Sequence, residues 1–295
     1  MNAQPYKFYF IIMLTNFIAT SSLQSDDVNS KDLAIHHFMQ GEFLLNQGNY
    51  ALAVLEFQDA ISIDPNASTI HVSIADAYRR LGRAKHAENH LKIAIDLDPK
   101  DISSREMLGQ LYLLSRNYIE AENQFLVLSH LDQDNDDYLS ILGDIAKIQQ
   151  QWIKSIDFFL DAYRINPQNF KALENAMQVC LTAELFKKAE GVCKLLVQFE
   201  PNNNSYWLTY KQITAYNKNY NSTLKAIAEL ERINGKSIKL SLEKSAIMQE
   251  LNKVDEAIKL LVEIHNPDSA NINIVERLVS MYLETENFID ADIFN

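Results

Sequence analysis

The chain has 295 residues, a formal net charge of −12, seven glycines, six prolines and two cysteines. The acidic charge argues against a nucleic-acid-binding protein, because such a surface needs clustered lysine and arginine to neutralise phosphates. With so few glycines and prolines, we expect no long flexible linker.

The first 22 residues differ in composition from the rest. Lys7 precedes an apolar run from Phe8 to Ala19, which small residues follow. The run is shorter than the roughly 20 residues of a comfortable membrane span, and the pattern is typical of a secretory signal peptide with Ala19 and Ser21 at its small-residue sites. We therefore expect residues 1–22 to be a signal peptide and the protein to be periplasmic or secreted, with a membrane anchor formed by an uncleaved leader as the alternative. Residues 23–33 are expected to be a polar leader.

From residue 34 onward, one pattern returns every 34 residues. Its first copy, Gly41 to Pro65, has the spacings of two short antiparallel helices with small residues where they touch. The small residue of the second helix recurs as Ala53, Ala87, Ala121, Ser155, Ala189, Thr223, Ala257 and Ala291. An aromatic residue recurs at the start of that helix as Tyr50, Tyr118, Trp152, Phe186, Tyr220 and Phe288. Proline closes four copies, as Pro65, Pro99, Pro167 and Pro201, because it cannot continue a helix.

This pattern resembles the tetratricopeptide repeat family, whose unit is a helix-turn-helix of 34 residues. The resemblance covers seven complete repeats in residues 34–271 and a partial eighth in residues 272–295. It implies an all-α fold, a right-handed superhelical solenoid of antiparallel helix pairs, rather than two globular domains. The match weakens along the chain: with residue 34 as position 1, position 8 is small in Gly41, Ala75, Gly109 and Gly143 but becomes Met177, Lys211, Ser245 and Val279. We expect the same fold there, with altered local crossing of the helices.

The two cysteines invite a disulfide in an exported chain. Cys180 is expected on the first helix of the fifth repeat and Cys193 on the second, about 10 Å out of register along the hairpin at 1.5 Å per residue. We therefore predict that both are small buried hydrophobic residues and form no disulfide.

Two groups resemble ligand sites or interaction sites but have simpler explanations. His86 and His90 lie four residues apart and could hold a metal from one helix face, but no third ligand is evident, so a solvated helix face is favoured. Arg79, Arg80 and Arg83 form a basic cluster that could meet an acidic partner. Ordinary salt bridges with nearby carboxylates are the favoured interpretation.

A third group imitates a calcium loop. Asp132, Asp134 and Asp136 match its first three ligands, but the sixth place is Asp137 instead of glycine and the twelfth is Gly143 instead of glutamate. The run lies between the third and fourth repeats, so capping of the next helix by these aspartates is favoured over calcium binding.

No catalytic constellation is found, so we expect a non-catalytic protein without cofactor or metal. The resemblance implies that positions 2, 5, 9 and 12 of each first helix face a concave groove for protein partners. The candidate groove residues are Phe38, Glu42, Asp76, Arg79, Glu106, Gln110, Asp144, Lys147, Glu174, Gln178, Leu208 and Gln212. This lining is polar and leans acidic, which favours a basic or polar extended peptide, or a partner helix.

Three functions remain open. The first is an exported scaffold, by family analogy in bacterial envelope, pilus or exopolysaccharide assembly. The alternative is the regulatory or substrate-recruiting region of an enzyme complex such as a glycosyltransferase, and a third is an intracellular adaptor similar to a co-chaperone. The chain stops within the second helix of the eighth repeat, without a polar capping helix. We therefore expect that a partner covers this end, or that the chain self-associates through it, or that the chain is a shortened relative of a longer protein.

Overall fold

The computed structural model describes residues 30–265 and 271–285, which contain helices and no strand. The predicted signal peptide, residues 23–29 of the polar leader and the last ten residues of the partial eighth repeat lie outside these ranges. A helix over residues 30–46 comes first. It is followed by α2 (Tyr50–Ile63), α3 (Ser68–Arg80), α4 (Ala84–Leu97), α5 (Ile102–Leu114), α6 (Tyr118–Leu131), α7 (Asp136–Ile148), α8 (Trp152–Ile165), α9 (Phe170–Thr182), α10 (Phe186–Phe199), α11 (Asn204–Tyr216), α12 (Tyr220–Asn234), α13 (Ile238–Glu250), α14 (Val254–Ile264) and α15 (Ile272–Glu284).

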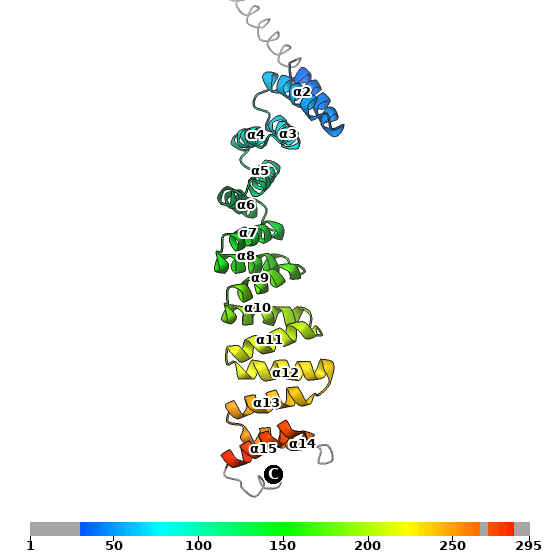
Figure 1. Ribbon diagram of the computed structural model, residues 1–295. Coiled ribbons are helices and arrows are strands. Elements are labelled where there is room, and N and C mark those ends of the chain that lie inside the picture. The colour runs from blue at the N-terminus through cyan, green and yellow to red at the C-terminus, as the bar shows by residue number, and fades with distance from the viewer. Residues whose placement is uncertain (1–29, 266–270, 286–295) are drawn as a thin grey trace, which may run out of the picture. The chain divides into compact units, whose positions relative to one another are not determined.

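The chain divides into two units, Met1–Ile145 and Ala146–Asn295. Within the first unit, each of the helices α2 to α6 packs against the next one along the chain (Figure 1). Within the second, the same holds from α8 to α15. Because these helices pack against their neighbours in sequence, the fold of each unit consists of stacked antiparallel helix pairs, and the predicted all-α solenoid class is confirmed.

The helices begin at regular intervals. First helices start at residues 68, 102, 136, 170, 204, 238 and 272, and second helices at 50, 84, 118, 152, 186, 220 and 254, which are steps of 34 residues. The weakened position 8 of the later repeats therefore leaves the helix starts unchanged. The division into seven complete repeats and a partial eighth stays a prediction.

A left-handed residue ends each first helix that the structure describes in full, from residues 30–46 to α13. The backbone angle φ is positive at Gly48, Gly82, Arg116, Gln150, Glu184, Lys218 and Asn252, again one residue in every 34. The next backbone N–H then reaches back to a carbonyl inside the helix, as Asn117 N does to Tyr112 O at 2.8 Å. This closes the helix and turns the chain into its second helix. Glycine takes this conformation without strain, and five repeats do without it.

Helix pairs touch where glycine meets an aromatic ring. A Cβ on Gly41 would lie 2.5 Å from the Phe57 ring, and one on Gly109 would lie 2.9 Å from the Phe125 ring. In the fifth repeat the sizes are reversed, since the same two positions hold Met177 and Cys193, both buried. The larger side chain has moved from the second helix to the first, which keeps the contact filled.

Aromatic residues at the start of second helices contact the following repeat. The Phe186 ring lies 4.2 Å from that of Tyr216, centroid to centroid, and the Arg80 guanidinium lies 5.6 Å from the centre of the Tyr50 ring. These two rings join one repeat to the next. No helix among the described residues is both long enough and apolar enough to cross a membrane.

The prediction for the cysteines is confirmed. Cys180 and Cys193 are both buried and form no disulfide. Burial raises the pKa of the Cys180 thiol to about 11 and that of Cys193 to about 12. Both are therefore uncharged, inert parts of the core at neutral pH.

Candidate functional site

The twelve predicted groove residues all lie on first helices, and each is at least partly exposed. Phe38 and Glu42 belong to the helix over residues 30–46, and the others follow in pairs on α3, α5, α7, α9 and α11. We call these twelve residues the first-helix face. Their exposure is compatible with partner binding, which stays a prediction.

Several carboxylates of this face hold neighbouring repeats together. The Tyr206 hydroxyl in the sixth repeat donates to Glu174 Oε1 in the fifth at 3.0 Å. The Tyr138 hydroxyl in the fourth repeat likewise donates to Glu106 in the third. Burial and the bond to Glu174 raise the pKa of Tyr206 to about 12, and burial likewise raises the pKa of Tyr138. Glu106 and Glu174 are therefore part of the packing between repeats.

A further carboxylate of the face is neutralised within its own helix. Asp76 pairs with Arg79 at 2.5 Å and with Arg80 at 2.8 Å, which confirms ordinary salt bridges for these two arginines. Glu42 accepts a hydrogen bond from the Ser73 hydroxyl of the next repeat. The acidic character of the face is thus weaker than the sequence alone suggests.

One pocket lies on the first-helix face of the second unit. It has a volume of about 260 Å³ and is formed by α9, α10 and α11. Its lining consists of Glu174, Met177, Gln178, Leu181, Cys193, Leu196, Ser205, Tyr206 and Thr209. Two of the predicted groove residues, Glu174 and Gln178, come together here above an apolar floor that includes Met177 and Leu196. A second pocket of about 250 Å³ in the first unit contains Phe38, between the helix over residues 30–46 and α3.

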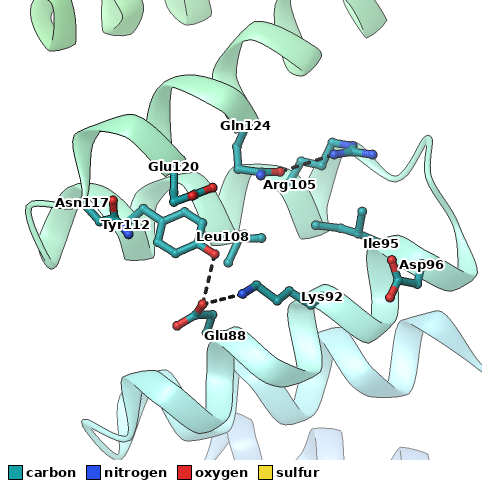
Figure 2. Close-up of a pocket in the computed structure, with 10 residues that line it drawn as sticks. All are labelled: Glu88, Lys92, Ile95, Asp96, Arg105, Leu108, Tyr112, Asn117, Glu120 and Gln124. Carbon is teal, nitrogen blue, oxygen red and sulfur yellow. Dashed lines mark hydrogen bonds and ion pairs between the residues drawn. The ribbon is translucent and has the colours of Figure 1, made fainter.

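Sequence reasoning missed a polar pocket of about 330 Å³ between α4, α5 and α6 (Figure 2). None of its lining residues belongs to the first-helix face. Figure 2 shows Glu88 between two donors, Lys92 Nζ at 2.7 Å and the Tyr112 hydroxyl at 3.1 Å. The bond from Lys92 holds the pKa of Glu88 below its usual range. Because Glu88 pairs with Lys92 on α4 and accepts from Tyr112 on α5, this network ties α4 to α5.

In three repeats, the side chain at position 4 contacts the carbonyl of the preceding proline, although the residue type differs each time. His71 Nε2 contacts Pro65 O at 3.3 Å, Arg105 Nη2 donates to Pro99 O at 2.8 Å, and Trp207 Nε1 donates to Pro201 O at 2.8 Å. Each side chain satisfies the carbonyl of the proline that closes the previous repeat. The signal in the sequence is a side-chain donor six residues after the proline, which periodicity of apolar residues does not reveal.

The favoured solvated face for His86 and His90 is right for one residue and wrong for the other. His86 is exposed, whereas His90 is half-buried and its Nδ1 lies 3.1 Å from His71 Nδ1. Pro65 O can only accept, so His71 donates to it through a hydrogen on Nε2. Burial and the nearby His71 and His86 lower the pKa of His90 to about 4. Contact between the two imidazoles therefore joins α3 to α4.

The N-terminus of α7 follows the aspartate run and is capped by a residue that the sequence interpretation did not name. Asn135 Oδ1 accepts from Asp137 N at 3.1 Å, so asparagine fills the capping role. Asp136 and Asp137 lie in the first turn of α7, where negative charge favours the helix dipole. Helix capping is thus confirmed, but by Asn135 instead of an aspartate.

Comparisons with known proteins agree with this architecture. Residues 37–67 and 68–101 match the family model of the tetratricopeptide repeat. A search of curated proteins finds no significant match. The structure of a MamA protein is 17% identical over 59% of this chain and 96% of that chain, with a TM-score of 0.50. The structure of Naa15/Naa10 bound to HypK-THB is 14% identical over 84% of this chain and 39% of that chain, with a TM-score of 0.55. At these identities both likenesses show the fold alone.

Proposed function

We propose, from the premise that this chain carries tetratricopeptide repeats, that it is a non-catalytic scaffold whose first-helix face binds segments of partner proteins. The observation that carries the proposal is the pocket between α9, α10 and α11. It gathers two residues of that face around an apolar floor, so it can receive one anchoring side chain of an extended peptide or a helix.

The lining of this pocket limits the kind of anchor. Met177 and Leu196 supply apolar surface, while Gln178 stands exposed at its edge with an amide that both donates and accepts. Glu174 already accepts from Tyr206, and Lys171 lies 3.5 Å from its other oxygen. The expected partner segment therefore presents an apolar side chain flanked by polar groups, and strong basic charge is not required.

A matched pair of variants tests this site. A peptide library is selected against the full chain, and the affinity of selected peptides is compared for Gln178→Arg and Gln198→Arg. Both glutamines are exposed, but Gln198 lies on α10 outside the pocket. We expect Gln178→Arg to weaken binding about tenfold or more, a loss of at least about 1.4 kcal/mol, with Gln198→Arg unchanged. If no peptide is selected, or if both variants behave alike, the proposed site is wrong.

Export and a role in envelope, pilus or exopolysaccharide assembly are finer proposals that rest on residues 1–22 and on family analogy. Fractionation of the native cell with N-terminal sequencing of the protein tests them, and a cytosolic chain that keeps Met1 would contradict export. The alternative of a recruiting region in an enzyme complex would replace the scaffold if one enzyme subunit copurified whatever residue stood at 178.

A further inference from the structure

Three side chains with metal-binding atoms meet at the first repeat. His37 comes from the helix over residues 30–46, and Glu56 and Asp59 lie three residues apart on α2. One ligand atom from each lies within 4.8 Å of the other two. His37 Nδ1 and Glu56 Oε2 are already 2.8 Å apart. Among the residues that the structure describes, this is the one such group of three.

The next repeats show which part of this set belongs to the repeat pattern and which part only the first repeat has. The residues 34 and 68 places further on are His71, His90 and Ile93, then Arg105, Gln124 and Val127. The pair at positions 4 and 23 touches in all three repeats: His37 with Glu56, His71 with His90, and Arg105 with Gln124. Only the first repeat adds a third ligand, Asp59, at position 26. In addition, His71 Nε2 already contacts Pro65 O.

The donor set suits a divalent ion of the zinc class. One neutral imidazole nitrogen and two carboxylate oxygens are ligands that Zn²⁺ accepts at about 2.0–2.2 Å, and two carboxylates balance its charge. A tetrahedral ion would bring the three atoms to about 3.4 Å from one another. Asp59 is exposed, so rotation of its side chain can supply this approach without moving a helix.

We propose that His37, Glu56 and Asp59 bind one Zn²⁺-class ion that joins the first helix to α2. The side chains of His37 and Glu56 are 26% and 31% exposed, so a fourth position remains open to water. The ligands come from two helices and meet only in the folded chain. The ion therefore binds the folded state selectively and stabilises the first helix pair. This inference is independent of the proposed partner binding.

The test uses the full chain without a histidine tag, freed of metal by a chelator. Zn²⁺ is titrated by calorimetry, and thermal melts are recorded with and without the ion. We expect one Zn²⁺ per chain and a higher melting temperature. Removing a ligand should weaken binding about tenfold or more, since even residues that only support a ligand cost 10–100-fold. His37→Gln and Asp59→Asn are the ligand variants.

Two control variants make the outcome decisive. His36→Gln changes the adjacent exposed histidine, and Asp96→Asn changes an exposed aspartate on α4. Both should bind Zn²⁺ like the unchanged chain. Absence of binding in stoichiometric amount overturns the proposal, as does binding that survives both ligand variants or falls equally in the controls. If His37→Gln unfolds the first repeat, the exposed Asp59→Asn alone decides the question.

Discussion

The ring of Phe57 occupies the space where a side chain on Gly41 would begin, with Cδ1 and Cε1 each 2.5 Å from the position of an added Cβ. Phe57 is fully buried, so its ring cannot move aside into solvent. We expect Gly41→Ala to destabilise the protein by about 1–3 kcal/mol, because a well-packed contact would be overfilled. Thermal or urea unfolding of the full chain measures this.

Gly191 is the matched control for that measurement. It lies inside α10, and an added Cβ would meet no atom within 4 Å. Gly191→Ala should therefore stabilise the protein by about 0.5–1 kcal/mol, since glycine is a poor residue inside a helix. Equal effects of the two substitutions would show that the contact with Phe57 is not tight.

Arg116 takes the left-handed conformation, with φ at 58°, in the turn after α5. Glycine adopts this conformation without the strain that a Cβ causes, but it also loses more freedom on folding. We expect Arg116→Gly to stabilise the protein by about 0.5–1 kcal/mol, and Gly48→Ala, at the same repeat position, to destabilise it. A loss of stability in Arg116→Gly, measured by urea unfolding, would argue against strain in this turn.

The hydrogen bond from Tyr206 to Glu174 joins the fifth repeat to the sixth. Tyr206→Phe should cost about 0.5–1.5 kcal/mol of stability, the usual net value of one hydrogen bond. Tyr216→Phe is the control. The Tyr216 ring packs on Phe186, but the residue as a whole is 67% exposed. Chemical unfolding should show a smaller loss for the control, and a reversed order would contradict the role of Glu174 between repeats.

The histidine pair makes stability depend on pH. The pKa of His90 is about 4 in the folded protein against an ordinary 6.5, so the unfolded chain binds the proton more tightly. Stability from this group is complete above pH 6.5 and is lost as the pH falls toward 4. We expect a loss of about 1–2 kcal/mol between pH 7 and pH 5.

Urea unfolding at several pH values measures this loss in two variants. His90→Gln should reduce the slope of stability against pH, because its amide can still form a hydrogen bond with His71 but does not titrate in this range. His86→Gln, at an exposed position, should leave the slope unchanged. A slope that His90→Gln does not alter would assign the effect to other groups.

Cys180 and Cys193 should resist thiol reagents in the folded protein. Both are buried, and their raised pKa values of about 11 and about 12 leave almost no thiolate at pH 8. Ellman's reagent should count two thiols per chain only after denaturation, and non-reducing mass measurement should show no disulfide. Rapid modification of either thiol in the native protein would contradict this burial.

Local sequence was sufficient for the helices and for much of the core. Ala53 and Ala121, predicted from their spacing, are fully buried, and the paired helices begin where the 34-residue interval places them. The solvated face predicted for His90 failed because its partner, His71, lies 19 residues away on another helix. Periodicity indicates which side of a helix is buried, but it does not indicate which polar atom of the neighbouring helix a side chain contacts.

The sequence by itself determined the repeat length, the helix pairs and the inert cysteines, because each follows from spacing along one hairpin. Only the tertiary structure decided which side chains meet between helices and repeats. Glu174 becomes a partner of Tyr206, and His37 comes beside Glu56 and Asp59. The physical reason is that hydrogen bonds and metal ligands require atoms within a few ångströms, and stacking alone sets those distances.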